Sequence, residues 1–195
     1  LSPAAEWEVD TFMRANDMDP EGRYICFALR KWPGFDERAE DIAAAARDAY
    51  KRHGLTPVFL SINHLDDLRA ADKTAEYLAG VPYRIINSAM GSAMTIGIME
   101  RMCAVVSMRL HGLIFAAEQG VPLVGISYDP KVRAFLKYIG QGPCMELGEA
   151  TAERLTECID DAVRRSGDSQ ARVEAAQRLR KIEGRNVEAA RRLLS

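Results

Sequence analysis

The sequence predicts an α/β protein built on a parallel, Rossmann-like sheet. Short apolar runs rich in β-branched residues alternate along the chain with longer stretches rich in alanine and charged residues. Several of the longer stretches stop at a glycine, a common residue just after the last turn of a helix. Strands that alternate with helices of about 10–15 residues form βαβ units, and the strands of such units run parallel.

Each element follows from its own local pattern. Asp129-Pro130 is a start signal for a helix after the last expected strand. The expected strands are RYICFAL (23–29), PVFLSI (57–62), YRII (83–86), CAVVS (103–107) and PLVGIS (122–127). The expected helices between them cover 36–52, 66–78, 92–101 and 110–120.

The two ends of the chain are expected to be helical flanks of a single domain that spans 1–195. Residues 1–20 contain one short amphipathic helix, over about 4–15. From 151 to 195 the chain is helical and rich in charge, with a break at Ser166-Gly167. Apolar residues recur at helical spacing in the last stretch, so we expect the C-terminal helices to pack back on the domain.

Charge balance and cysteine spacing exclude several classes of protein. The 195 residues include 26 basic and 28 acidic side chains, so no overall positive field exists to hold nucleic acid. The four cysteines form no CxxC pair, which excludes a zinc knuckle and a thioredoxin-like redox motif. The first residues lack a signal-peptide pattern, and the apolar runs are too short to span a bilayer. We expect a cytoplasmic chain with reduced cysteines.

The usual nucleotide-binding fingerprints are missing. No GxGxxG follows the first strand and no GxxxxGK[ST] occurs, which argues against a plain dehydrogenase or NTPase. In an open α/β sheet the ligand site lies beyond the carboxyl ends of the strands, so the residues that follow each strand are the candidates. Cations, histidines and an acid gathered at one edge indicate a small-anion site. These candidates are Arg30, Lys31 and Trp32; Asn63 and His64, with Asp67 nearby; Met108, Arg109 and His111; and Tyr128, Asp129 and Lys131.

The sharpest candidate is the turn Arg109-Leu110-His111. An arginine at the start of a helix adds a bidentate donor to the free backbone N–H groups and to the positive end of the helix dipole. The same helix end favours a neutral imidazole, which suits proton transfer to or from an anionic substrate. The alternative is structural, with Arg109 paired to a carboxylate and His111 capping or packing.

The other strand-end residues carry weaker signals. Arg30 directly follows an apolar strand, where an edge cation favours a binding role. Trp32 either lines a pocket wall or packs, and His64 also suits a simple loop at a helix entry. Tyr128 belongs to a turn that opens the next helix, and Lys131 in its first turn faces either a ligand or solvent.

Three segments resemble one family of enzymes. VVSMRLHGLIFAAEQGVPLVGISYDPKVRAFL (105–136) is similar to the signature region of polysaccharide pyruvyl transferases, in particular the CsaB type. ICFALRKWPGFDE (25–37) resembles the start of that family's second half, where a strand ends in an arginine followed by an aromatic residue. FLSINHLDD (59–67) is a looser match. The resemblance covers about residues 20–140.

The resemblance implies a fold, a reaction and a set of site residues. Members resemble GT-B glycosyltransferases, and they transfer pyruvate from phosphoenolpyruvate to two hydroxyls of a sugar as a cyclic ketal. It implies no metal or cofactor, since phosphoenolpyruvate is the donor substrate. The implied catalytic acid or base is His111. The implied substrate-binding residues are Arg30, Arg109 and Leu110, and the strand-end candidates His64, Tyr128 and Lys131 are expected to bind substrate with them.

The resemblance also implies a partner domain and an acceptor. Family chains are about twice this long, and this chain starts at Leu1 rather than Met, so we expect it to be the C-terminal, phosphoenolpyruvate-binding half, inactive by itself. The implied acceptor is a sugar or lipid-linked saccharide of a cell-wall polysaccharide that anchors surface-layer proteins, with a peripheral membrane position as one option.

Two other functions stay open at this point. One is the donor-binding half of a nucleotide-sugar GT-B glycosyltransferase or epimerase, and the other is a non-catalytic anion- or sugar-binding module.

Overall fold

The core of the molecule is a parallel β-sheet. The computed structural model describes residues 2–62, 64–87 and 90–194; for His64 and 182–194 only the backbone is described. Within these residues six strands pair in the order β3-β2-β1-β4-β5-β6, all parallel, which confirms the predicted fold class. The strands are β1 (Tyr24–Ala28), β2 (Thr56–Leu60), β3 (Arg84–Ile86), β4 (Met102–Ser107), β5 (Leu123–Ser127) and β6 (Cys144–Glu146).

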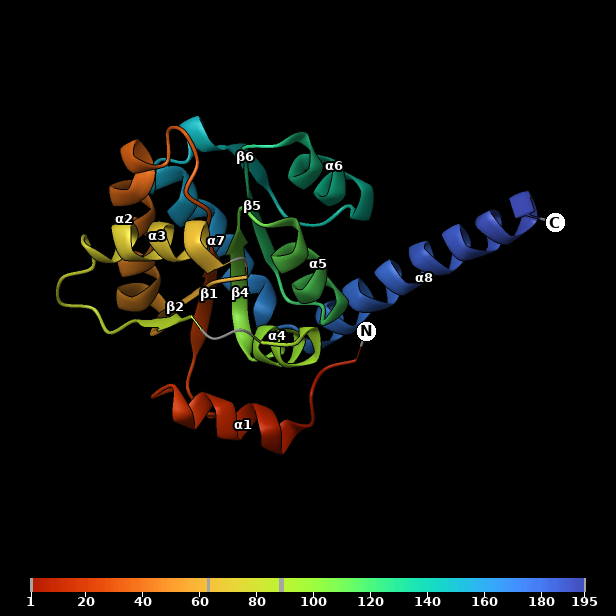
Figure 1. The fold of residues 1–195 in the computed structure, drawn as a ribbon, viewed down its shortest axis with the longest axis horizontal. Coiled ribbons are helices and arrows are strands. Elements are labelled where there is room, and N and C mark those ends of the chain that lie inside the picture. Colours follow the sequence, from red (N-terminus) through yellow and green to blue (C-terminus); the bar gives the residue numbers. More distant parts are fainter. Residues whose placement is uncertain (1, 63, 88–89, 195) are drawn as a thin grey trace.

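Helices cover both faces of the sheet (Figure 1). One face packs against α2, α3 and α7, and the other packs against α1, α4, α5, α6 and the first part of α8. The helices are α1 (Glu6–Ala15), α2 (Asp36–His53), α3 (His64–Ala75), α4 (Ser92–Glu100), α5 (Leu110–Glu118), α6 (Pro130–Ile139), α7 (Ala152–Ser166) and α8 (Ser169–Leu194), with a 3₁₀ turn at Leu147–Glu149.

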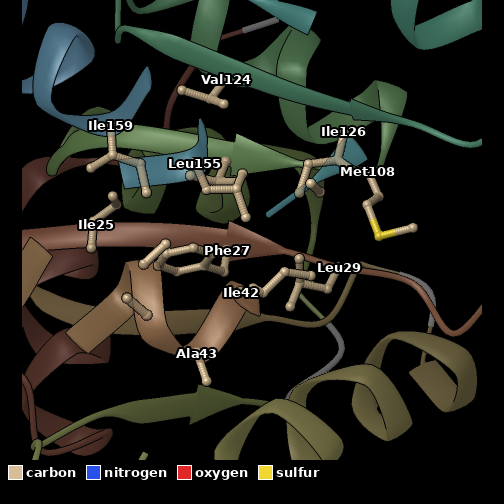
Figure 2. Close-up of a cluster of buried hydrophobic side chains, with 14 of the residues drawn as sticks. Ile25, Phe27, Leu29, Ile42, Ala43, Met108, Val124, Ile126, Leu155 and Ile159 are labelled. Carbon is tan, nitrogen blue, oxygen red and sulfur yellow. The ribbon is translucent and has the colours of Figure 1, made fainter. Parts of the chain in front are cut away.

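The central strands are buried on both faces, which explains their continuous apolar runs. All five residues of β1 are buried, as are all five of β5. Figure 2 shows Phe27 of β1 between Ile42 of α2 and Leu155 of α7. The Phe27 ring also stacks on Phe59 of β2, with ring centroids 5.5 Å apart. This layer holds the first half of the sheet rigid beneath the edge where the strands end.

The predicted flanks are helices, and α7 and α8 are held to the rest of the domain by different residues. The imidazole of His53 lies 2.7 Å from the Asp160 carboxylate, which ties α7 to the end of α2. Leu179, in the first half of α8, is buried, and the Gln141 side chain donates to the Ala175 carbonyl at 3.1 Å. The break between the two helices falls at Gly167-Asp168, next to the predicted position. The remainder of α8 extends to one side of the sheet (Figure 1).

Among the described residues, the sequence analysis does not anticipate the strand β6. It has three residues and pairs only with β5, at the edge of the sheet. Its residues, Cys-Met-Glu, include no β-branched side chain, whereas the equally short β3 contains two isoleucines and is predicted.

The described cysteines are free thiols, as expected. Burial raises the pKa of Cys26, in the middle of β1, to about 12, so this thiol stays protonated near neutral pH. None of the helices in the described ranges combines the length and the apolar character needed to cross a bilayer.

The strand order determines where a ligand can bind. Successive strands run outward from β1 to β3, and the chain then returns to place β4 on the other side of β1. The strand order therefore reverses between β1 and β4. In open α/β sheets this switch point opens a crevice at the carboxyl ends of the strands.

Candidate functional site

A cleft of about 720 Å³ lies at this switch point. Its walls come from the residues that follow β1, β2, β4 and β5, and from the first turns of α4, α5 and α6. Backbone N–H groups at a helix start have no partner within the helix, and the dipole adds partial positive charge there. Three helix starts at one cleft therefore favour an anionic ligand.

Arg109 is fixed at the start of α5 by a serine at the end of β4. The Arg109 N–H donates to the Ser107 hydroxyl at 2.9 Å, and that hydroxyl donates to the Arg109 carbonyl at 2.8 Å. Arg109 is the N-cap residue and has an extended backbone, so the chain turns sharply from strand into helix. This turn brings the first N–H groups of α5 to the cleft.

Gly112 lets α5 approach the strands closely. A Cβ at this position would lie 2.8 Å from the Ser107 hydroxyl and 3.3 Å from the Ala28 methyl group. Any larger side chain at 112 would therefore push the helix start away from the sheet, along with the residues that line the cleft.

A buried carboxylate holds the Arg109 side chain. The Asp67 side chain is 1% exposed, and its Oδ2 lies 3.4 Å from Nε of Arg109, itself only 10% exposed. The same oxygen accepts the Ile62 backbone N–H at 3.0 Å. The carboxylate pairing considered from the sequence is therefore present, and Arg109 also lines the cleft. A paired guanidinium beside an open cleft can bind an anion with little loss of side-chain freedom.

Arg30 follows β1, the strand next to β4, and lines the cleft among aromatic rings. Its Nη1 donates to the Tyr128 hydroxyl at 3.1 Å, and its Cζ lies 5.4 Å from the Trp32 ring centroid and 5.5 Å from that of Tyr128. Asp66 is 3.8 Å from Nη2. The buried Nε has no hydrogen-bond partner in the part of the chain that the structure describes. The aromatic contacts confine the cation at the cleft wall.

Three further candidates lie at the first turns of α5 and α6. Leu110 is the first residue of α5 and lines the cleft. The exposed His111 also lines the cleft, with its ring centroid 6.2 Å from that of Phe115. Lys131 lines the cleft from the first turn of α6, and its backbone N–H donates to the capping Asp129 carboxylate at 2.8 Å.

Six of the seven predicted site residues thus line one cleft, namely Arg30, Arg109, Leu110, His111, Tyr128 and Lys131. His64 begins α3, but its side chain lies outside the described part of the structure. Lys31 forms an ion pair with Asp36 and is absent from the lining residues. The sequence analysis missed three hydroxyl residues of the lining, Ser61, Ser92 and Thr95.

Solved structures define the class of fold. The glycosyl transferase family 9 protein from Veillonella parvula matches with a TM-score of 0.61 and 17% identity, over 84% of this chain and 53% of that one. UDP-GlcNAc 2-epimerase from Methanocaldococcus jannaschii, in complex with UDP-GlcNAc and UDP, matches with a TM-score of 0.61 and 12% identity, over 90% and 48%. The glycosyltransferase VinC in complex with DTDP matches with a TM-score of 0.57 and 16% identity, over 98% and 45%.

The chain spans about half the length of these proteins, and its fold is the Rossmann-like one found in GT-B glycosyltransferases. The sequence model for "Polysaccharide pyruvyl transferase" matches residues 5–130 of the 195. The chain therefore belongs to the polysaccharide pyruvyl transferase family. The matched region includes every predicted site residue except Lys131, which follows it directly. No curated protein sequence matches the chain.

The close approach of α5 predicts the effect of a single methyl group. Alanine in place of glycine inside a helix normally stabilises it by about 1 kcal/mol. We expect Gly112→Ala to lower the free energy of unfolding instead, by about 1–3 kcal/mol, because the added methyl meets Ser107. Gly148→Ala is the matched control, since nothing lies within 4 Å of a Cβ there. Urea unfolding followed by circular dichroism measures both, and equal stabilities would contradict the close packing.

The neighbouring acids Asp66 and Asp67 allow a matched test of the buried ion pair. Asp67→Asn keeps the shape of the side chain but leaves Arg109 without its counter-charge, and we expect a loss of about 3–5 kcal/mol in stability. Asp66 is 48% exposed, and Asp66→Asn should cost about 0–1 kcal/mol. Thermal and urea unfolding would separate the two variants. Similar small losses in both would show that Arg109 does not depend on Asp67.

Proposed function

We propose that this chain is the donor-binding domain of a pyruvyl transferase. It binds phosphoenolpyruvate in the cleft at the ends of β1, β4 and β5, and the pyruvyl group passes to a sugar of a surface polysaccharide as a ketal. Membership of the family supports the class of reaction. The observation that carries the proposal is the position of Arg109, held by Asp67 at the start of α5 and open to the cleft.

Phosphoenolpyruvate matches the charge of the site. It is small and carries a carboxylate and a phosphate close together, so it needs cations on more than one side. Arg109, Arg30 and Lys131 all line the cleft and supply three cations. The first N–H groups of α5, beginning at Leu110, add neutral donors for phosphate or carboxylate oxygens. Fixed donors of this kind also stabilise the phosphate as it leaves.

The reaction assigns a proton-transfer role to His111. Protonation of the methylene carbon of phosphoenolpyruvate turns it into a methyl group and leaves C2 as an oxocarbenium-like centre. One sugar hydroxyl attacks C2, and a second hydroxyl of the same sugar then displaces phosphate as the C2–O bond to phosphate breaks. Of the two hydroxyl protons, one balances the proton given to carbon and the other leaves with phosphate. His111 lines the cleft beside Arg109 and is exposed there, where an imidazole can give and accept these protons.

Two alternative functions have distinct expected outcomes. The fold shared with enzymes solved in complex with UDP or DTDP favours a nucleotide-sugar donor as the second candidate. A non-catalytic module would bind an anion through Arg109 without needing His111. As part of the proposal, the acceptor is a saccharide of a cell-wall polysaccharide, free or lipid-linked, and the reaction takes place in the cytoplasm.

Arg109→Lys tests the donor site. Lysine keeps a positive charge for Asp67 but loses the planar fork that binds two oxygens at once. A charge-assisted hydrogen bond contributes about 1.5–3 kcal/mol, so we expect the Kd for phosphoenolpyruvate to rise about 10- to 100-fold. Calorimetric titration of the 195-residue chain measures this, and a thermal melt shows that the variant is folded.

Arg133→Lys is the control, because Arg133 is exposed and pairs with Glu146 on the surface. It should bind phosphoenolpyruvate like the parent chain. Equal weakening in both variants would contradict a role of Arg109 in the site. Binding of UDP-GlcNAc with no binding of phosphoenolpyruvate would move the chain to the nucleotide-sugar enzymes.

His111→Ala separates catalysis from binding. Loss of a general acid or base lowers turnover by about 10²- to 10⁴-fold. We expect that loss in acceptor-dependent phosphate release by the active enzyme, with a much smaller change in the Kd for phosphoenolpyruvate. Turnover at the level of the parent enzyme would exclude His111 as the acid or base, and a loss confined to affinity would make it a binding residue.

A further inference from the structure

One aromatic residue next to the cleft, Trp32, has no role in the proposed donor site. The Trp32 ring is 40% exposed, one of a few large apolar side chains of the described residues with this exposure. Its centroid lies 4.7 Å from that of Tyr128 and 5.4 Å from Cζ of Arg30. Both neighbours line the cleft, whereas Trp32 does not, so Trp32 lies at the rim directly outside it.

The ring of Trp32 is also held in place. Tyr128 and Arg30 contact it, and the Trp32 carbonyl accepts the Phe35 N–H at 2.9 Å in the turn that leads into α2. Phe35 itself is fully buried. An exposed indole that is anchored in this way offers a flat apolar surface at low entropic cost. A pyranose ring presents a matching surface, because its axial C–H groups form an apolar face.

Polar groups around Trp32 suit the hydroxyls of a sugar. The half-exposed Asp66 carboxylate lies 3.8 Å from Nη2 of Arg30, and the Lys31 backbone N–H donates to the Asp66 carbonyl at 2.9 Å. The exposed Asp36 carboxylate pairs with the Lys31 ammonium group in the same turn. These two carboxylates can accept hydrogen bonds from the hydroxyls of a neutral sugar. The rim therefore combines a flat apolar surface with hydrogen-bond acceptors, which suits a carbohydrate.

We propose that Trp32, supported by Tyr128, is the platform on which a pyranose ring of the acceptor stacks. The assignment rests on the proposed function, because it needs phosphoenolpyruvate in the cleft. The acceptor hydroxyls must reach C2 of a donor held between Arg30 and Arg109. A sugar stacked on Trp32 lies beside Arg30, on the open side of the donor site. The platform thus determines which hydroxyl pair faces C2.

The chain contains its own internal control for this proposal. Its two tryptophans give two indole N–H signals in a nitrogen–proton NMR spectrum, and Trp7 is 69% exposed on α1, a helix that packs against α4. With phosphoenolpyruvate saturating, we expect methyl β-D-galactopyranoside or methyl β-D-glucopyranoside to shift the Trp32 signal saturably and to leave the Trp7 signal in place. Titration to about 50 mM covers Kd values in the millimolar range.

Two variants at Trp32 provide the mutational test. Trp32→Ala should abolish the glycoside-induced shifts at the Tyr128 backbone amide, and Trp32→Phe should restore part of them because a ring is present again. No glycoside shift at Trp32, or equal shifts at Trp7 and Trp32, would overturn the platform. A saturable shift of Trp32 by UDP alone would also overturn it in favour of a nucleobase. Failure of phosphoenolpyruvate to shift Leu110 and His111 would contradict the donor site instead.

Discussion

A buried ion pair between Asp67 and Arg109 links the two halves of the sheet, β1 to β3 and β4 to β6, at the edge where the cleft opens. Asp67 belongs to α3, which follows β2, and Arg109 begins α5, which follows β4. The carboxylate also receives the Ile62 N–H at the end of β2. A charge this deeply buried must be paired, since desolvation otherwise costs several kcal/mol. The ion pair therefore constrains both the spacing between the two halves of the sheet and the orientation of the Arg109 guanidinium.

The other features of the site depend on that arrangement. Ser107 and Gly112 set the start of α5 against the strands, and Tyr128 and Trp32 confine Arg30 at the cleft. Cations and helix starts whose positions are fixed before the ligand arrives need little reorganisation, and preorganised charge of this kind contributes most to stabilising developing charge in catalysis. The same contacts extend to the rim, where the Trp32 indole packs against Tyr128 and Arg30 beside the cleft.

Most of the fold follows from local sequence, whereas the completed site does not. The run RYICFAL predicts β1 because a strand buried on both faces is apolar throughout, and residues after β1, β4 and β5 share an edge in any parallel sheet. The pairing of Asp67 with Arg109 depends on which strands are neighbours, a long-range property that no local pattern contains. Ser61, Ser92 and Thr95 carry hydroxyls too common to stand out, and β6 contains no β-branched residue to indicate a strand.

The most direct measurement of the central claim is a backbone amide NMR titration of the chain with phosphoenolpyruvate. The account predicts saturable shifts concentrated at Arg30, Leu110, His111 and Lys131, the residues that line the cleft at the switch point. Shifts that leave these residues unchanged and gather instead in the groove between α1 and α8 would contradict it.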